Sequence, residues 1–403
     1  MSADLATAPL REALAETLPE RPFSVQLWDG SALPPTNGVD GPTFRIRSPR
    51  AFGHVLRAPG QLGLGRAYVS GEIEVDDMDA VLDLLDGYQV PPLDTRGKLR
   101  LAVAAARAGA LRSIPRPPQA ELRPRGRRHS RERDQRAVTH HYDVSNEFFR
   151  LFLGDSMTYS CAIFSRGAET LEEAQRAKLE LVCTKLGLGP GERVLDVGCG
   201  WGSFALHAAR EHGARVTGIT LSAEQADLAR GRVSAAGLED QVEICLADYR
   251  DLAGEQYDAI SSIGMVEHVG SANLDAYAAT LASVLRPGGR LLNHGIARLR
   301  IGDPEAGPFS ERFVFPDAAP LHVSRVLAAI ERAGLEPRHV EGFRSDYART
   351  LSEWTRNLEA NSDRAETLIG VERMRIWRLY LRAARRGFET GFTSIFQVVA
   401  HKP

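Results

Sequence analysis

The feature that most constrains this chain is a regular alternation of apolar runs and helical segments that begins near residue 170. The apolar runs are RVLDVGCG, RVTGITL, VEICLADY, YDAISSIGM and RLLNHGIARL, and segments such as WGSFALHAAREHG and LDAYAATLASVLRPGG separate them. Alternating helices and buried-looking strands predict an α/β fold with a doubly wound, mostly parallel sheet. Ligands bind such sheets at the carboxyl ends of the strands, so functional residues are expected there.

The first of these strands ends in a glycine-rich loop, VLDVGCGWG, with Gly198, Gly200 and Gly202 at alternate positions. The dinucleotide fingerprint has the spacing G-x-G-x-x-G and an acid near the end of the second strand. Here Asp196 precedes the glycines, and the second strand ends in Thr220 without an acid. S-adenosylmethionine fits better, because it has no pyrophosphate and needs a close backbone approach that a Cβ would block. A tight turn without a ligand is the alternative, and the flanking strand and helix disfavour it.

The ends of the third and fourth strands narrow the substrate class. CLADY places Asp248 and Tyr249 where a carboxylate and an aromatic face can hold an adenine, although an Asp at such a position is also a common helix cap. The fourth strand ends in SSIGMVEHVG, not in the Asn-Pro-Pro-aromatic run of enzymes that methylate DNA amino groups. The net charge of −2 gives no general attraction to nucleic acid, so no nucleic-acid partner is expected.

Composition shifts divide the chain into three parts. Residues 1–111 combine short strands, such as PFSVQLWDG and TFRIRSP, with helical segments, and they predict a smaller N-terminal α+β domain. Residues 112–136 are rich in Pro and Arg and are interpreted as a flexible, solvated linker. A compatible alternative is a basic strip that touches anionic lipid head groups, where each Lys or Arg contributes about 1 kcal/mol. Residues 137–403 contain the alternating strands and helices.

Cysteine use and the N-terminus indicate the compartment. The four cysteines have neither metal-ligand spacing nor the density of a disulfide framework, which favours a reducing cytoplasm and predicts no metal. The N-terminal residues include acids and lack the apolar core of a signal peptide, and no stretch approaches the length of a transmembrane helix. Any membrane contact is therefore expected to be peripheral, at the inner face of the cell membrane.

Residues 141–161, HYDVSNEFFRLFLGDSMTYSC, mix polar and aromatic side chains densely, so the segment should pack with its polar groups satisfied. Together with LDVGCGWGSFALHAA, TLSAEQ, DYRDL, SSIGMVEHVG, NHGIA and SDYARTL, it resembles the cyclopropane-fatty-acid synthase family over roughly residues 135–400. Members of that family use S-adenosylmethionine to modify double bonds in membrane lipid acyl chains. The resemblance implies a Rossmann-like class I methyltransferase fold, and the N-terminal domain and basic linker resemble the phospholipid-acting members.

The resemblance also implies roles for individual residues. The family's positions that contact S-adenosylmethionine match Tyr159, Ser160, Asp196, Gly198, Gly200, Thr220, Gln225, Tyr249 and Arg250. The family holds a bicarbonate ion beside the reacting methyl group, and its contacts match Cys161, Glu267, His294, the backbone around Ile296, and Tyr347. Residues 141–161 are then expected to form a lid-like helical segment over the cofactor and one wall of the acyl channel.

The chemistry of an isolated alkene explains why such a set is needed. An enzyme cannot activate an alkene by deprotonation and can only hold it near the sulfonium methyl and exclude water. The carbocation left by methyl transfer must lose a proton to a base that is not itself alkylated. A small anion held by Glu267, His294 and Tyr347 suits this role, and two adjacent anions are expected to share a proton. By themselves, Cys161 is a buried apolar residue and His294 a core histidine, but the neighbouring Glu267 favours a site. Cys161 is expected to line it, not to act as a nucleophile.

Departures from the family pattern bear on the product. Many members have Asp in place of Glu147, a glycine-rich segment followed by Leu-Pro in place of VFPDAAPLHVSRV, and a cysteine in place of Ala384. NHGIAR and FETGF resemble an actinobacterial branch that makes methylene-branched chains, which a partner reductase then converts to methyl-branched ones. We favour that product over a cyclopropane, with Glu147 as the candidate residue that decides between them.

Two other functions stay open. An O- or N-methyltransferase for a polar small molecule needs a base near a hydroxyl or amine but no bicarbonate pocket. A non-catalytic module would bind S-adenosylmethionine or lipid without turnover. The set implied by the resemblance argues against both and favours a membrane phospholipid with an unsaturated acyl chain as the partner. Three roles stay open for the N-terminal domain: membrane binding, lipid shuttling or homodimer formation.

Overall fold

The computed structural model describes residues 3–89, 91–92, 94–111, 115–123, 125–142, 144–304 and 307–403. These residues form two compact units. The first unit comprises Met1–Glu121 with Gly370–Ala383, and the second comprises Leu122–Ile369 with Ala384–Pro403. The sequence predicted boundaries at residues 111 and 136, whereas the structure divides the chain after residue 121 and returns to the first unit near the C-terminus.

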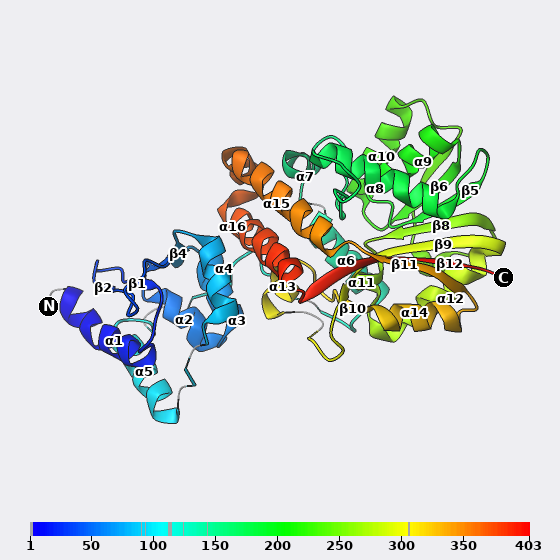
Figure 1. The fold of residues 1–403 in the computed structure, drawn as a ribbon. Helices are drawn as coiled ribbons and strands as arrows, with labels where there is room; N and C mark the ends of the chain where they lie inside the picture. The colour runs from blue at the N-terminus through cyan, green and yellow to red at the C-terminus, as the bar shows by residue number, and fades with distance from the viewer. Residues whose placement is uncertain are drawn as a thin grey trace. The chain divides into compact units, whose positions relative to one another are not determined.

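The second unit is built on an eight-stranded sheet in the order β11-β12-β9-β8-β5-β6-β7, with β10 paired to β9 beside this path (Figure 1). Neighbouring strands among the first five in the chain run parallel, while β12 pairs antiparallel with both β9 and β11. This arrangement confirms the predicted doubly wound, mostly parallel sheet. The strands are β5 (Arg193–Val197), β6 (Arg215–Thr220), β7 (Val242–Leu246), β8 (Tyr257–Ile263), β9 (Leu285–Arg298), β10 (Leu321–His322), β11 (Glu336–Gly342) and β12 (Thr393–His401).

Helices cover both faces of this sheet (Figure 1). On one face, α8 (Leu171–Leu186), α9 (Ser203–His212) and α10 (Ala223–Ala235) share one apolar core with the strands. On the other face, α12 (Leu274–Val284) and α14 (Val323–Arg332) share a second core. Local sequence sets these helices: α8 begins at a capping box between Thr170 and Glu173 and ends before Gly187, which takes the left-handed conformation that ends many helices.

The remaining helices of the second unit lie around the carboxyl edge of the sheet and in the C-terminal part. They are α6 (Arg131–Tyr142), α7 (Asn146–Leu153), α11 (Val266–Val269), α13 (Pro308–Phe313), α15 (Arg344–Ala360) and parts of α16 (Ser362–Glu389), with the 3₁₀ turns η1 (Tyr249–Asp251) and η2 (Ser271–Asn273). α7 lies inside the 141–161 segment, and its Phe148, Phe149, Phe152 and Leu153 are fully buried. This confirms that the segment packs.

The helix α16 is interrupted at Gly370, whose φ of 79° is not helical. A glycine adopts this backbone conformation without the steric cost that other residues meet. The interruption coincides with the point where the chain leaves the second unit, and residues 370–383 group with the first unit.

The first unit has a four-stranded sheet in the order β2-β1-β3-β4, which confirms a smaller α+β domain. The elements of this unit are α1 (Ala3–Thr17), β1 (Ser24–Gln26), β2 (Ala32–Leu33), β3 (Thr43–Ile46), α2 (Arg50–Arg57), α3 (Gln61–Val69), β4 (Ile73–Val75), α4 (Met78–Gly87) and α5 (Thr95–Arg107). Its core includes Leu10, Val25 and Ile46, and a buried ion pair joins Arg66 to Glu121 at 2.7 Å. No helix among the described residues of either unit is long and apolar enough to span a bilayer.

Candidate active site

A cavity of about 160 Å³ opens at the carboxyl edge of the parallel strands, where the fold predicts a ligand. Nine of the predicted cofactor residues line it: Tyr159, Ser160, Asp196, Gly198, Gly200, Thr220, Gln225, Tyr249 and Arg250. They come from the segment after α7, from β5 and the loop that follows it, from the end of β6, from the first turn of α10, and from η1 after β7. The structure therefore brings together residues that are up to 91 positions apart, as Tyr159 and Arg250 are.

The glycine loop forms the floor of this cavity. Gly198 and Gly200 have φ values of 77° and 55°, so both lie in the left-handed region. A Cβ on Gly198 would lie 2.6 Å from Cγ of Met265, which itself lines the cavity. Gly202 does not line the cavity: it is the N-cap of α9, and a Cβ there would meet Ala229 of α10 at 3.3 Å. Its role is to let two helices approach.

Asp196, at the end of β5, is the buried acid beside this loop. Burial raises the pKa of its carboxyl to about 7, against the opposing effect of the Lys178 ammonium. Its Oδ2 has no hydrogen-bond partner within the part of the chain that the structure describes. A buried polar atom without a partner is costly, so Asp196 is suited to receive a polar group of a ligand.

Lys178 is a site residue that the sequence analysis missed. It lies on α8, is buried, lines the cavity, and donates from Nζ to Oγ of Ser160 at 3.0 Å. Burial lowers the pKa of Lys178 to about 8, while the thiol of Cys161 and the carboxyl of Asp196 act in the opposite direction. The available signal was its position: Ala174, Lys178 and Val182 follow at four-residue steps, so the lysine shares the apolar face of its helix.

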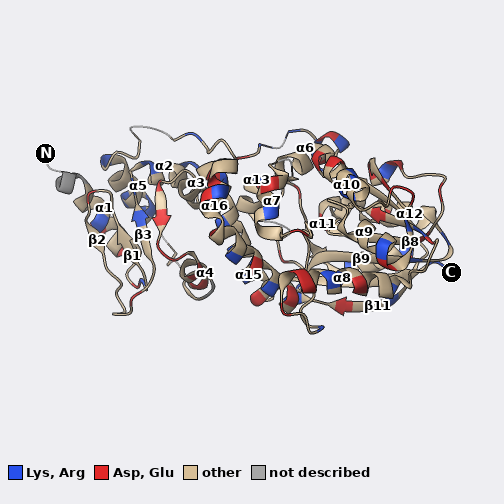
Figure 2. Cartoon of the chain, turned by 90° about the horizontal axis from the view of Figure 1, so that it is seen from above, with Lys and Arg blue, Asp and Glu red and all other residues tan. Residues whose placement is uncertain are grey.

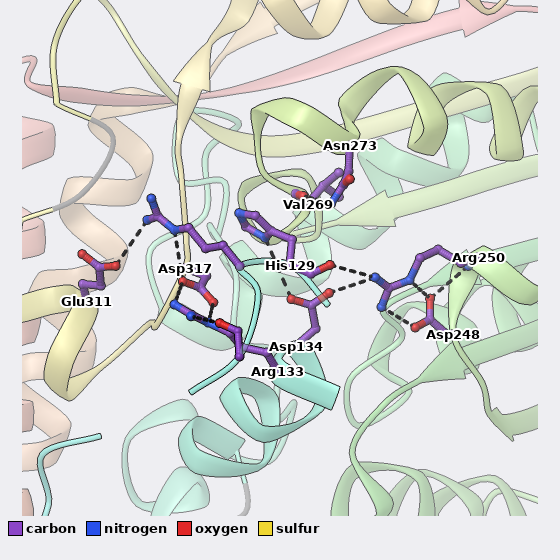
Figure 3. A network of polar contacts seen from close by, with 11 residues as sticks. His129, Arg133, Asp134, Asp248, Arg250, Val269, Asn273, Glu311 and Asp317 are labelled. Atoms are coloured by element: carbon purple, nitrogen blue, oxygen red, sulfur yellow. Dashed lines mark hydrogen bonds and ion pairs between the residues drawn. The ribbon is translucent and has the colours of Figure 1, made fainter. Parts of the chain in front are cut away.

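Asp248 was predicted to hold the adenine, but it does not line the cavity. Its carboxylate accepts hydrogen bonds from the Arg250 side chain, at 2.8 Å to Nε and 2.5 Å to Nη2, as Figure 3 shows. Burial would raise the pKa of Asp248, but the hydrogen bonds from Arg250 outweigh burial and hold the pKa below its usual range. Asp248 thus positions Arg250, and Tyr249 and Arg250 form the cavity wall.

The predicted flexible linker is ordered where it meets the site. Arg250 also pairs with Asp134 of α6 at 3.0 Å, and Arg128 and Arg133 both bind Asp317 (Figure 3). α6 contains residues of both charge signs, which Figure 2 colours blue and red along the helix. Several arginines of the linker therefore form ion pairs with acidic side chains. Anionic lipid head groups were the alternative partner predicted for these arginines. Further along α6, His141 and Tyr142 also line the cavity.

Behind the cavity lies a second cluster, which contains the predicted bicarbonate contacts. Cys161, Glu267, His294 and Tyr347 are all buried, and none of them lines the cavity. The carbonyl of Phe343 joins two of them: it accepts from Sγ of Cys161 at 3.8 Å and from the backbone N–H of Tyr347 at 3.0 Å. The Phe343 ring stacks on His294 with a centroid distance of 6.3 Å.

The protonation of His294 follows from its partners. Lys185 donates to Oε1 of Gln397 at 2.6 Å, which fixes the amide so that its Nε2 donates to Nδ1 of His294 at 3.0 Å. Burial lowers the pKa of His294 well below its usual value, so the ring is neutral. With Nδ1 accepting, the proton lies on Nε2. That N–H is buried and has no partner among the described residues.

Glu267 presents the complementary group. Burial raises the pKa of its carboxyl to about 7, while the backbone N–H groups of Glu267 and Ile296 favour the ionised form. Its Oε2 is buried without a hydrogen-bond partner in the described structure, and a Cβ on Gly295 would lie 3.3 Å from that oxygen. The cluster thus offers one unpaired N–H and one unpaired carboxyl oxygen from neighbouring segments.

The remaining members of the cluster are accounted for by packing. Burial raises the pKa of Cys161 well above its usual value, so the group is a thiol and a poor nucleophile. Tyr347 packs on Phe388 with ring centroids 4.6 Å apart. Glu147 does not belong here: its side chain is half exposed at the start of α7 and pairs with Arg364 at 3.2 Å. The hypothesis that Glu147 decides the product in the pocket is corrected by this position.

Comparison with known proteins gives consistent matches. The sequence model of the family described as mycolic acid cyclopropane synthetase matches residues 129–398. The probable fatty acid methyltransferase Rv3720 of Mycobacterium tuberculosis is 41% identical over 400 residues, covering 95% of this chain and 92% of that protein. The cyclopropane-fatty-acyl-phospholipid synthase of Escherichia coli is 34% identical over 365 residues, covering 90% and 88%. The solved mycolic acid cyclopropane synthase CmaA1, complexed with SAH and CTAB, has a TM-score of 0.63 and 33% identity over 66% of this chain and 98% of that chain.

Proposed function

Because the chain belongs to the mycolic acid cyclopropane synthetase family and is an S-adenosylmethionine-dependent methyltransferase of fatty acyl chains, we propose that it methylates a cis double bond in a membrane phospholipid. The observation that carries this proposal is the pair of buried, unpartnered atoms behind the cofactor cavity, Nε2 of His294 and Oε2 of Glu267, within the described part of the chain. An O- or N-methyltransferase deprotonates the substrate's own hydroxyl or amine and needs no separate site for a small anion.

The cavity supports S-adenosylmethionine as the methyl donor. The related CmaA1 binds the demethylated cofactor in its solved complex. Asp196 and Lys178 provide one acid and one base on the cavity wall, which suits the ammonium and carboxylate of an amino-acid tail. Tyr249 and Arg250 provide an aromatic face and a planar cation that suit an adenine. A Cβ added to Gly200 would meet no atom within 4 Å, so this glycine leaves open space for a close ligand.

The second cluster fits bicarbonate. Bicarbonate has oxygen atoms that can accept a hydrogen bond from the N–H of His294. It also has one O–H, which can donate a hydrogen bond to a carboxyl oxygen such as that of Glu267. When bound, it would supply a base that is not alkylated. A Glu267 pKa of about 7 lets this carboxyl hold or release a proton near neutral pH, so two anions need not lie side by side. Cys161 and Phe343 are buried, and apolar side chains beside the ion would exclude water.

Peripheral membrane contact through the first unit is part of the proposal. Large apolar side chains of this unit are exposed: Leu56, Leu64, Leu85, Leu99, Val103 and Leu111. Leu99 and Val103 are one turn apart on α5 and therefore share a helix face. We assign this surface to the inner face of the cell membrane in the cytoplasm, with homodimer formation as the alternative use. Loss of liposome sedimentation in Leu99→Glu/Val103→Glu, with unchanged oligomeric state, would support the membrane.

The product that we propose is the methylene-branched chain, which a partner reductase would convert to the methyl-branched one. It rests on the likeness of NHGIAR and FETGF to the actinobacterial branch. The test is to incubate the protein with S-adenosylmethionine and dioleoyl phospholipid liposomes and to analyse the fatty acid esters by mass spectrometry and proton NMR. Vinylidene protons support the methylene branch, and upfield ring protons mean a cyclopropane. Cofactor binding without any lipid product contradicts the substrate assignment.

A separate measurement tests bicarbonate. The same reaction is run in buffer freed of carbon dioxide and then with bicarbonate restored. Loss and recovery of turnover, with unchanged cofactor affinity, is the expected result. Full turnover in the depleted buffer would remove the ion from the proposal and leave the acyl-chain substrate standing.

A further inference from the structure

Two helices on one face of the sheet bring together a cysteine, two histidines and a glutamate. Cys183 lies on α8, and His207 and His212 lie on α9. One donor atom from each of the three lies within 4.8 Å of the other two. Glu180, one turn before Cys183, places Oε2 at 3.2 Å from Nε2 of His207 and at 3.0 Å from Nε2 of His212.

We propose that Cys183, His207, His212 and Glu180 form a structural zinc site. Thiolate, imidazole and carboxylate are the ligands that zinc takes, usually four in a tetrahedron. A thiolate disfavours magnesium and calcium, which prefer oxygen ligands. Bound donors would lie about 3.5 Å apart, given zinc–ligand distances of about 2.0–2.3 Å. The donors of Cys183, His207 and His212 lie within 4.8 Å of one another and would move closer on binding, while Glu180 would reach the ion from its contacts with the two histidines.

The charges of the cluster also suit a divalent cation. Zinc binds the thiolate form of cysteine, the neutral form of histidine and the ionised form of glutamate. On binding, the S–H bond breaks, sulfur keeps the electron pair and binds zinc, and the proton passes to water. One thiolate and one carboxylate then balance the two positive charges.

The position of the cluster assigns it a structural role. None of the four residues lines the cofactor cavity. His207 borders an open surface hollow of about 350 Å³, which gives an ion access from solvent, while Cys183 is fully buried between the helices. α8 carries Lys178 and α9 follows the glycine loop, so zinc would tie together two helices that shape the cavity. The sequence predicted no metal, because these ligands follow no compact spacing motif.

Metal titration of the full-length protein, purified with a chelator, tests the site. Zinc is titrated against a chromophoric chelator, with one tight equivalent and release of one proton per ion expected. Cobalt in place of zinc should give a thiolate-to-cobalt charge-transfer band that is absent in Cys183→Ala. The matched control is Cys245→Ala, which removes a partly exposed cysteine on β7 and should keep the band.

The two partly exposed histidines keep the test valid if Cys183→Ala does not fold. His207→Asn and His212→Asn should each lower zinc affinity at least tenfold and remove most of the zinc-induced rise in Tm, with an unchanged circular dichroism spectrum. The absence of a stoichiometric zinc equivalent in the wild-type protein would overturn the proposal. So would zinc affinity that is unchanged in both histidine variants.

Discussion

The Gln397 side-chain amide donates to Nδ1 of His294 at 3.0 Å, and this single hydrogen bond assigns the tautomer of a buried histidine. The amide cannot rotate without losing the 2.6 Å bond that Lys185 gives to its oxygen. His294 therefore directs an N–H toward the position that we assign to bicarbonate. Gln397 thus sets the hydrogen-bonding role of a residue that we propose to hold bicarbonate.

Gln397→Glu is expected to reverse that role. A carboxylate would accept from both Lys185 and Nδ1 of His294, which moves the ring proton away from Nε2. The bicarbonate oxygen would then lose its donor at Nε2, and an unsatisfied buried acceptor costs about 1–3 kcal/mol, so turnover should fall roughly 10- to 100-fold while the cofactor Kd stays constant. Steady-state methyl transfer and calorimetry with S-adenosylhomocysteine measure the two quantities. Gln256→Glu, on the exposed surface, is the control, and equal turnover in both variants would contradict the tautomer argument.

The carboxyl of Glu267 should make stability depend on pH. Its pKa is about 7 in the folded protein against an ordinary value of 4.5, so the protonated form is favoured by folding. Its contribution is complete below pH 4.5 and is lost as the pH rises through 7, a change of about 3 kcal/mol. Glu267→Gln should therefore show a flatter pH dependence of the free energy of unfolding, measured with urea at pH 4.5 and 7.5. Glu331→Gln, exposed on α14, should behave like the wild type.

Lys178→Met is expected to weaken cofactor binding without unfolding the protein. Burial lowers the pKa of Lys178 to about 8, so its ammonium has a desolvation cost that a methionine side chain of similar length avoids. The lost charge-assisted hydrogen bond is worth about 1.5–3 kcal/mol, so the Kd for S-adenosylhomocysteine should rise at least tenfold. A double-mutant cycle with Ser160→Ala should show coupling, because Lys178 donates to that hydroxyl. Lys98→Met, on the exposed surface of α5, serves as the control; an equal Kd in both lysine variants would exclude the role.

Glu147→Asp should leave both rate and product unchanged. The Glu147 side chain is half exposed, and exposed ion pairs such as that with Arg364 contribute about 0–1 kcal/mol. The ratio of vinylidene to ring protons in the NMR spectrum of the product esters is the measurement. A shifted ratio would restore Glu147 as a determinant of product.

The sequence was sufficient for the features that repeat or that occur at strand ends. Apolar periodicity predicted the parallel sheet, and the glycine loop predicted the cavity, because both signals are local. The direction of a side chain could not be predicted in this way. The position of Glu147 beside a functional motif does not tell whether its side chain points to the pocket or to solvent. Lys178 was missed because a lysine in a helix is usually solvated, and only the register with Ala174 and Val182 reveals it. The linker was predicted to be flexible because the sequence does not show which acids its arginines pair with. One of these acids, Asp317, lies far along the chain.

Part of α16 belongs to the first unit and part to the second. The first unit therefore cannot be removed by deleting the N-terminal residues alone. The chain leaves the first unit after residue 121, re-enters it at Gly370 and leaves again after Ala383. In the returning stretch, Met374, Ile376, Trp377 and Leu381 are buried. A shortened protein that starts at residue 122 would keep this apolar stretch and lose the residues with which it groups. Such a truncation is expected to aggregate, which size-exclusion chromatography would detect. Point substitutions on α5 are therefore the better tool, because the chain connects the N-terminal unit to the rest of the enzyme at three places, after residues 121, 369 and 383.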